Sequence, residues 1–324
     1  MTAIALLVEP GSTPSSVMTT LDMFNIASRY PEMGACRVDL LSSTGGSIQL
    51  APAVRVETQV LPERLESYAA VILPGFFAAD IESLYGQLQS VWQPAIARLR
   101  ALSPGALAAA SCYGTFVLAE SGLLDGRQAT TTWWLQAAFR QRYSKVELDA
   151  DQALADGGNV LTAGAMTAHT DLSLHVVRRL YGAVLARKVG AIMLVDGART
   201  SQRPFMALQR NFADPLVQAA ADWLAQHRTA AISTHDLAAE LHVSYRTLHR
   251  RFNCATGTAP LAYLQALRVE LAKELLESTR QSLEQIVEEV GYRDVSAFRR
   301  LFVRTAGLSP AQYRQRFKSG QYST

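Results

Sequence analysis

The last hundred residues of this 324-residue chain contain an internal repeat with an offset of fifty. Five residue types recur at identical spacing in the two copies: Arg250, Phe252, Gly257, Pro260 and Tyr263, then Arg300, Phe302, Gly307, Pro310 and Tyr313. Because a chance match rarely recurs in register, the repeat predicts one supersecondary unit used twice. The pattern of each copy predicts a helix, a tight turn and a second helix that carries arginine. This arrangement is typical of a chain that contacts DNA twice.

Each copy is predicted to be a pair of helices with its own caps and turn. Including the helices before and between the copies, the predicted helices span residues 215–226, 236–241, 244–253, 261–276, 283–290 and 295–305. Thr234 is the expected cap of the first pair, and Ser282 with Gln285 forms an expected capping box in the second. His242 and Gly291 lie in the two turns. Leu237 and Leu241 in the first helix of the first copy match Ile286 and Val290 in the second copy at an offset of forty-nine. The difference of one residue from the offset of fifty therefore falls inside the turns.

A helix in the major groove needs an apolar face that holds it and a polar face that contacts bases. Leu248 with Phe252, and Phe298 with Phe302, form the expected holding faces. The expected DNA-contacting residues are Tyr245, Arg246, His249, Arg250, Asn253, Ser296, Arg299, Arg300 and Arg304. Arginine can bond both acceptors on the major-groove edge of guanine, which discriminates by about 1–3 kcal/mol.

Two alternatives remain open for individual arginines. Arg251, Arg293 and Arg304 lie nearer the helix edges and suit phosphates, which position a protein without specifying sequence. The repeated arginines 250 and 300 are either DNA contacts or structural partners of a nearby carboxylate such as Glu240 or Glu289.

Net charge is distributed unevenly along the chain. The whole chain carries 31 basic and 28 acidic side chains, for a formal net charge of +3. Residues 1–214 carry 17 basic and 18 acidic side chains, a balance of −1, and residues 215–324 carry 14 and 10, a balance of +4. We therefore expect a polyanion to bind the half that contains the repeat.

Composition argues against several other protein classes. Apolar residues make up 49% of the chain and charged residues 18%, as in globular proteins. Cys36, Cys112 and Cys254 are scattered and lack a C-x-x-C pair, which argues against a disulfide framework or a metal site and favours the cytoplasm. No apolar run is long enough for a membrane span, and the N-terminus lacks a basic leader. We expect neither a cofactor nor a membrane partner.

The first two hundred residues alternate strand and helix patterns. Continuous apolar runs, typical of buried parallel strands, cover residues 4–8, 38–41, 69–73 and 107–110. Helical spacing covers residues 15–28, 88–102, 116–121 and 171–186. The alternation predicts an α/β fold: a doubly wound, mostly parallel, flavodoxin-like sheet, followed by an all-α domain with two helix-turn-helix units. The expected organisation is a domain over 1–196, a polar linker over 197–214, a helical domain over 215–317 and a tail over 318–324.

One short segment of the first half has the pattern of a nucleophile elbow. Ala110, Cys112 and Gly114 lie where a strand turns sharply into a helix, with small residues flanking the central side chain. The positive end of the helix dipole favours the thiolate form of Cys112. Catalysis also needs a base, and the neighbouring Tyr113 cannot act as one near pH 7.

Residues 215–317 resemble the AraC/XylS family of transcription regulators. The matching residues are Leu237-Ala238, Ser244, Arg246, Leu248, Arg250, Phe252, Gly257, Pro260, Tyr263, Arg268, Ala272, Leu275-Leu276, Ile286, Val290-Gly291-Tyr292, Ser296, Phe298, Arg300, Phe302, Gly307, Ser309-Pro310 and Tyr313-Arg314. The resemblance implies two helix-turn-helix units joined by a long helix on successive major grooves of double-stranded promoter DNA. It also implies RNA polymerase as a partner.

Residues 3–190 resemble the class I glutamine-amidotransferase-like superfamily, in its PfpI branch. The matching segments are Leu73-Pro74-Gly75, Ala110-Ser111-Cys112-Tyr113-Gly114, Gly122-Leu123-Leu124-Asp125-Gly126, Ala129-Thr130-Thr131 and Trp133. The order of the fused domains resembles the GlxA type of regulator. Enzymes of the branch have His after the Cys and Glu in the loop after the first strand, but here Tyr113 and the segment 12–16, Ser-Thr-Pro-Ser-Ser, stand there. Related regulators often have His where this chain has Thr132. The departures imply that the fold persists without hydrolysis.

What remains is an expected ligand pocket at the carboxyl ends of the parallel strands. Its candidate residues are Glu9, Gly75, Phe76, Cys112, Tyr113, Trp133 and His169. His169 is the candidate for a displaced base. The alternative interpretation of Cys112 is a small buried residue inherited with the fold, and the predicted site has no catalytic residue beyond this one weak candidate.

The first functional hypothesis is a transcription factor whose N-terminal domain binds a small metabolite. The resemblance implies a homodimer and a nitrogenous metabolite. The second hypothesis is a cysteine-dependent hydrolase or lyase fused to a DNA-binding domain. The third is a DNA-associated structural protein that needs no ligand.

Overall fold

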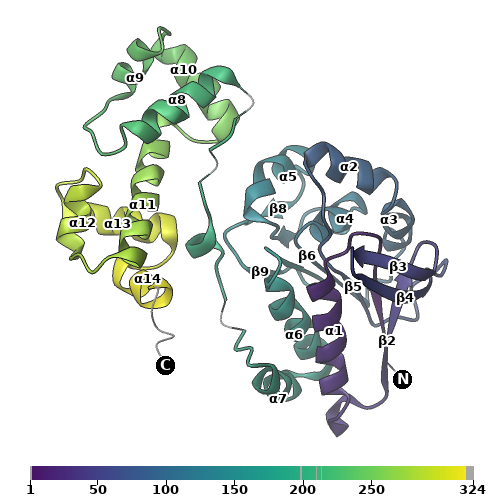
Figure 1. The fold of residues 1–324 in the computed structure, drawn as a ribbon. Helices are drawn as coiled ribbons and strands as arrows, with labels where there is room; N and C mark the ends of the chain where they lie inside the picture. The colour runs from purple at the N-terminus through teal and green to yellow at the C-terminus, as the bar shows by residue number, and fades with distance from the viewer. Residues whose placement is uncertain (1, 198, 209, 213, 319–324) are drawn as a thin grey trace. The chain divides into compact units, whose positions relative to one another are not determined.

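The computed structural model describes residues 2–197, 199–208, 210–212 and 214–318, and Figure 1 shows its fold. The contacts divide the chain into an α/β unit, Met1–Gln202, and a helical unit, Arg203–Thr324. The boundary lies inside the predicted linker over 197–214, because the side chains on either side of it pack with different units. The predicted tail over 318–324 lies outside the described residues apart from Lys318.

Eight described strands form the main sheet of the α/β unit, in the order β3-β4-β2-β1-β5-β6-β10-β9. The strands are β1 (Thr2–Leu7), β2 (Cys36–Ser42), β3 (Gly46–Ala51), β4 (Val54–Val60), β5 (Ala70–Leu73), β6 (Leu107–Ser111), β9 (Leu154–Asp156) and β10 (Val160–Ala163). The central strands are parallel, and β3 and β9 add antiparallel edges. The structure confirms the predicted mostly parallel sheet. A separate two-stranded sheet pairs β7 (Gln128–Ala129) with β8 (Glu147–Leu148).

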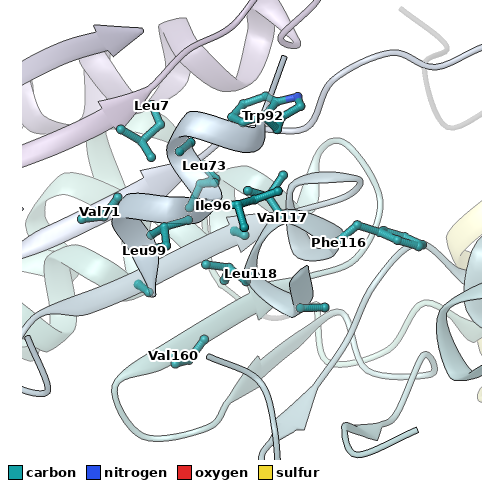
Figure 2. Packing of buried hydrophobic residues seen from close by; sticks show 14 of the residues in the cluster. Leu7, Val71, Leu73, Trp92, Ile96, Leu99, Phe116, Val117, Leu118 and Val160 are labelled. Atoms are coloured by element: carbon teal, nitrogen blue, oxygen red, sulfur yellow. The ribbon is translucent and has the colours of Figure 1, made fainter. Parts of the chain in front are cut away.

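Helices cover both faces of the main sheet, which explains why the central strands are apolar throughout. One face packs against α2 (Ile81–Gln89), α3 (Gln93–Leu99) and α4 (Gly114–Glu120), and Figure 2 shows this core around Leu73, Trp92 and Phe116. The other face packs against α1 (Pro14–Ala27), α6 (Ala168–Tyr181) and α7 (Ala183–Met193). The remaining helices of this unit are η1 (Pro31–Met33), η2 (Trp133–Leu135) and α5 (Gln136–Arg142).

Two predicted helices of the α/β unit were wrong in their extent. The predicted helix over 171–186 is interrupted at Gly182, whose φ of 89° ends α6 before α7 begins. The predicted helix over 88–102 is split into the end of α2, which stops at Gln89, and α3, which begins at Gln93 and has Pro94 in its first turn, where proline is tolerated. The hairpin of β3 and β4 was not predicted.

The helical unit contains η3 (Arg203–Phe205), α8 (Pro215–Gln226), α9 (Thr234–Glu240), α10 (Tyr245–Thr256), α11 (Pro260–Ser278), α12 (Leu283–Glu289), α13 (Val295–Ala306) and α14 (Pro310–Phe317). Its described residues form two separate hydrophobic cores. Tyr263, Leu264 and Leu267 of α11 belong to the first core, with α8, α9 and α10. Val269 and Ala272 belong to the second, with α12, α13 and α14. Among the described helices, none combines the length and apolar character that a membrane span requires.

The caps and turns repeat between the two helix pairs. Ser282 and Gln285 form the predicted capping box of α12. The predicted cap Thr234 was wrong: Ser233 caps α9 and shares a capping box with Asp236, because its hydroxyl reaches the backbone N–H of Asp236 at 3.2 Å. His242 and Gly291 adopt the same left-handed conformation in the two turns, with φ of 53° and 80°.

Candidate functional site

The second helix of the first pair, α10, has one buried and one exposed face. Ser244 caps it by accepting from the backbone N–H of Thr247, and Leu248 and Phe252 are fully buried against the core. The predicted DNA-contacting residues lie on the outer side, where Tyr245, Arg246, Arg250 and Asn253 are exposed and His249 is half-buried.

An aromatic stack occupies the start of this exposed face. The ring of Tyr245 lies between those of His235 and His249, with centroid separations of 4.8 and 5.6 Å and nearly parallel planes. His235 comes from α9, so the first helix of the pair contacts Tyr245 of the second, and Tyr245 in turn stacks on His249. The repeat did not predict this contact, because His235 matches Glu284 in the second copy.

The second helix of the second pair, α13, has the same division of faces. Asp294 caps it by accepting from the N–H groups of Ser296 and Ala297, at 2.8 and 3.0 Å. Phe298 and Phe302 are fully buried. The predicted DNA-contacting residues of this copy are all exposed: Ser296, Arg299, Arg300 and Arg304. We call α10 and α13 the recognition helices.

Carboxylates lie close to the arginines of α13. The pKa of Glu284 is below its usual value because its own backbone N–H and the Ser282 hydroxyl donate to the carboxylate, with a smaller effect from the charge of Arg299. The pKa of Asp294 is also lowered, mainly by hydrogen bonds from the helix start and slightly by the charge of Arg300. The exposed face of α13 is therefore more mixed in charge than that of α10.

The two carboxylates named as structural partners of the repeated arginines do not pair with them in the described part of the chain. No ion pair joins Arg250 to Glu240 or Arg300 to Glu289 there, and Glu289 instead accepts a hydrogen bond from Gln281 at 2.7 Å. Arg300 has a different carboxylate nearby, that of Asp294, whose pKa its charge lowers slightly. Arg251, in contrast, is held by the carboxylate of Asp214, the N-cap of α8, with 2.8 Å between Nε and Oδ2. Arg251 thus ties α8 to α10, a role that the phosphate prediction missed.

The elbow of the α/β unit has the predicted backbone geometry. Cys112 has a φ of 55°, and its N–H donates to the carbonyls of Ala163 and Gly164 at 3.0 and 2.9 Å. A Cβ on Gly114 would lie 2.6 Å from the carbonyl oxygen of Pro74, so only glycine fits there. A Cβ on Gly75 would lie 2.9 Å from that of Cys112. The close packing leaves the thiol buried.

Burial decides the protonation of this thiol. It raises the pKa of Cys112 to about 12, an effect larger than the lowering by a hydrogen bond with the backbone of Tyr113. The expected thiolate was therefore wrong, since a group with this pKa is a neutral thiol at pH 7.

Five of the seven candidate ligand residues lie near one another: Gly75, Phe76, Cys112, Tyr113 and Trp133. Phe76 contacts the ring of Tyr113 edge-on at 5.9 Å, and the Tyr113 hydroxyl accepts from the indole N–H of Trp134 at 3.2 Å. These side chains, with Gly75 and Cys112, form what we call the elbow cluster. Trp133 lies beside it, with 5.3 Å between its ring and that of Trp134.

Glu9 and His169 make other contacts. The buried carboxylate of Glu9 accepts from the backbone N–H of Ser43 at 2.8 Å and from its hydroxyl, and burial raises its pKa. The ring nitrogens of His169 lie 2.8 Å from the hydroxyls of Thr20 and Ser111. Complete burial lowers the pKa of His169 to about 4, so the ring is neutral. Both of its nitrogens are thus committed inside the core, away from a role as a displaced base.

Two neighbouring residues of the predicted linker, Gln202 and Arg203, make hydrogen bonds in different units, which the sequence did not predict. The amide of Gln202 is buried in the α/β unit, where it donates to the carbonyls of Thr131 and Ala150, both at 2.9 Å. Thr131 in turn donates to the carbonyl of Cys112 at 3.3 Å. The next residue, Arg203, donates to the carbonyl of Arg304 at the end of α13, at 3.2 Å. No local sequence signal marks this change of partner, because all these contacts are long-range.

Comparison with known proteins gives both halves a family. Residues 2–179 match the model of the DJ-1/PfpI family, and residues 237–316 match a helix-turn-helix domain model. The HTH-type transcriptional regulator CdhR of Pseudomonas aeruginosa is 27% identical over 95% of this chain and 90% of its own length. The HTH-type transcriptional regulator GbdR of the same species is 26% identical over 65% of this chain and 58% of its own length.

Solved structures share the α/β fold. A crystal structure from Vibrio parahaemolyticus matches with a TM-score of 0.50 and 18% identity, over 60% of this chain and 98% of that chain. The chain therefore belongs to the DJ-1/PfpI family through its α/β unit and carries an AraC-type helix-turn-helix domain, the composition of a DNA-binding transcription regulator.

Proposed function

We propose that this DNA-binding regulator contacts two segments of one promoter with α10 and α13, and that a small metabolite bound by its α/β unit controls the contact. The supporting observation is that α10 and α13 each have one buried apolar face and one exposed polar face. Two equivalent helices each bury the expected apolar pair, Leu248 with Phe252 and Phe298 with Phe302, and expose polar and arginine side chains. Direct base contacts come from Arg246, His249, Arg299 and their exposed neighbours, and Arg304 at the edge contacts phosphate.

The test of this proposal is a promoter-binding titration at several salt concentrations. The double variant Arg246→Ala with Arg299→Ala is expected to lose sequence preference, because both substitutions remove side chains that reach bases. Arg29→Ala, an exposed arginine of the α/β unit, is the matched control and keeps wild-type binding. An unchanged sequence preference in the double variant would refute the assignment of the recognition helices.

We also propose that the α/β unit binds rather than catalyses. Three observations support this: the Cys112 thiol is neutral and buried, Tyr113 stands where related enzymes have a base, and His169 is committed to two hydroxyls. Assays of wild type against Cys112→Ala, with thiol-dependent hydrolase and lyase substrates, test the enzyme alternative. Turnover by the wild type alone would establish that alternative.

The effector site is proposed at the elbow cluster, with Phe76, Tyr113 and Trp133 as contact residues. A hollow of about 390 Å³ elsewhere in the same unit offers a comparison, since Arg178, His175 and the ion-paired Asp171 and Arg199 line it. A thermal-shift screen of small nitrogenous metabolites identifies ligands of the wild type, because a ligand that binds only the folded state raises its stability. The shift is expected to disappear in Tyr113→Ala and to persist in Arg178→Ala. The opposite pattern would move the site to the hollow.

The remaining partners belong to the same proposal. We infer a homodimer that places two helical units on repeated half-sites, with RNA polymerase as a further partner. Sedimentation of the full chain with and without promoter DNA tests the dimer, and a monomer bound to a single site would remove it.

A further inference from the structure

The two recognition helices are joined by more than the helix that connects them. In α11, Leu267 belongs to the first core and Val269 to the second. Arg268 lies between them, at the point where α11 passes from one core to the other. Because the two cores are separate and α11 contributes to both, the placement of the two helix pairs relative to each other depends on side chains near Arg268.

Arg268 links the first helix pair to the second. Its Nε donates to the carbonyl oxygen of Arg228 at 2.7 Å, and one terminal nitrogen donates to the carbonyl oxygen of Ala230 at 2.6 Å. Both carbonyls belong to the loop between α8 and α9. The guanidinium also lies 5.2 Å from the ring centroid of Tyr292, in the turn between α12 and α13. Tyr292 packs edge-on against Phe298 of α13, at 5.1 Å.

The backbone of the same loop lies directly against that turn. A Cβ on Gly291 would lie 2.3 Å from the carbonyl oxygen of Thr229 and 2.8 Å from its carbonyl carbon. These are backbone atoms, so a side chain at position 291 would force the loop and the turn apart. His242 has the matching left-handed conformation in the first turn and carries an exposed side chain. The requirement for glycine at position 291 therefore comes from the contact between the two pairs as well as from φ.

We propose that Arg268, the 228–230 loop and the Gly291-Tyr292 turn form a seam that sets the separation of α10 and α13, and hence the spacing of the two DNA segments that the protein recognises. The inference rests on the proposed function. Arg268 acts as a positioning residue, because its Nε and one terminal nitrogen donate to backbone carbonyls of the 228–230 loop. The seam selects spacing, whereas the exposed faces of the recognition helices select bases.

The test is a spacing series on duplex DNA with the full chain. A duplex selected from a random library by the wild type is altered by inserting or deleting one or two base pairs between its two contacted segments. The wild type is expected to lose affinity at least tenfold for each change. Arg268→Ala is expected to bind the original duplex roughly tenfold more weakly and to bind all spacings almost equally. Arg268→Lys is expected to behave similarly, because an ammonium cannot reproduce the fork that contacts two carbonyls.

Arg293→Ala is the matched control, because Arg293 is exposed in the same turn and is a candidate phosphate contact. It is expected to weaken binding at every spacing and to keep the spacing preference. Gly291→Ala is an independent second probe of the seam and is expected to flatten the preference as Arg268→Ala does. A wild-type spacing profile in folded Arg268→Ala and Gly291→Ala, at whatever affinity, would overturn the inference.

Amide hydrogen exchange without DNA separates this result from a failure of the proposed function. Exchange at residues 228–230 and 291–293 is expected to rise at least tenfold in Arg268→Ala, while the α10 interior stays protected. Equal protection in the two proteins would overturn the seam. A wild type that selects no duplex sequence would instead overturn the proposed function, and exchange would then decide whether the seam exists.

Discussion

The two helix-turn-helix pairs share their interiors and differ on their exposed faces. Leu248 and Phe252 of the first pair and Phe298 and Phe302 of the second are all completely buried. On the outside, the first pair presents an aromatic stack around Tyr245, and the second presents arginines beside carboxylates. Burial constrains the residues that hold a recognition helix in place, whereas exposed residues are free to match different bases. Each pair is therefore expected to contact a different sequence with the same fold.

The largest expected effects test whether the two interiors are equivalent. Phe252→Ala and Phe302→Ala are each expected to lower the free energy of unfolding by about 3–5 kcal/mol, because each leaves a cavity in a small core. Urea unfolding of the full chain, followed by helical circular dichroism, measures both. Phe77→Ala, at a phenylalanine that is 56% exposed, is the control and is expected to cost far less. A cost in only one pair would break the equivalence.

Single substitutions on the exposed faces sharpen the contrast in base recognition. Arg246→Ala and Arg299→Ala are each expected to lose about 1–3 kcal/mol of base discrimination, at different base pairs of the promoter. Competition binding against every single-base variant of the selected duplex measures this. If both variants lost discrimination at the same base pairs, the two helix pairs would not contact separate DNA segments.

His235 and Glu284, which lie on the first helices of the two pairs near the recognition helices, are expected to affect DNA binding in opposite directions. His235→Ala removes the ring that stacks on Tyr245 and is expected to weaken DNA binding severalfold. Glu284→Gln removes a negative charge near Arg299 and is expected to strengthen binding and to steepen its salt dependence by up to about one phosphate contact. Titrations at two salt concentrations measure both changes, and shifts of the same sign would contradict the contrast.

The smallest expected effect is a difference in acid sensitivity. Asp294 caps α13, whereas the matching cap of α10 is Ser244, which does not titrate. Because the folded pKa of Asp294 is lowered, its stabilising contribution is present above its unfolded value and is lost as pH falls through the folded pKa. Amide exchange at the start of α13, corrected for intrinsic rates, is expected to rise below pH 4, and Asp294→Ser should abolish the rise. Equal responses of α10 and α13 would remove the asymmetry.

The sequence was sufficient for features that depend on local pattern. The repeat predicted both helix pairs, the Ser282 capping box and the buried faces of α10 and α13. It misassigned the cap of α9 because Ser233 and Thr234 are both good capping residues, and only their geometry decides which hydroxyl reaches Asp236. The helix over 171–186 was misjudged because its apolar spacing continues past the break that Gly182 makes.

Features that depend on distant partners could not be predicted. The protonation of Cys112 follows from burial by segments far away in the chain, which local helix geometry does not reveal. The ion pair between Asp214 and Arg251 and the contacts of Arg268 with the 228–230 loop need the tertiary structure. The contacts of Glu9 with Ser43, and of His169 with Thr20 and Ser111, likewise depend on how distant strands and helices pack together.

The junction at Gln202 and Arg203 leaves the backbone little freedom at the boundary of the two units. The two side chains are committed to different units, yet a single peptide bond, about 3.8 Å between Cα atoms, connects them. A flexible linker needs several residues without fixed contacts. No such residue separates Gln202 from Arg203 while the hydrogen bonds of both side chains are formed. The freedom of the chain at this junction is therefore limited to the few backbone dihedrals of these two residues.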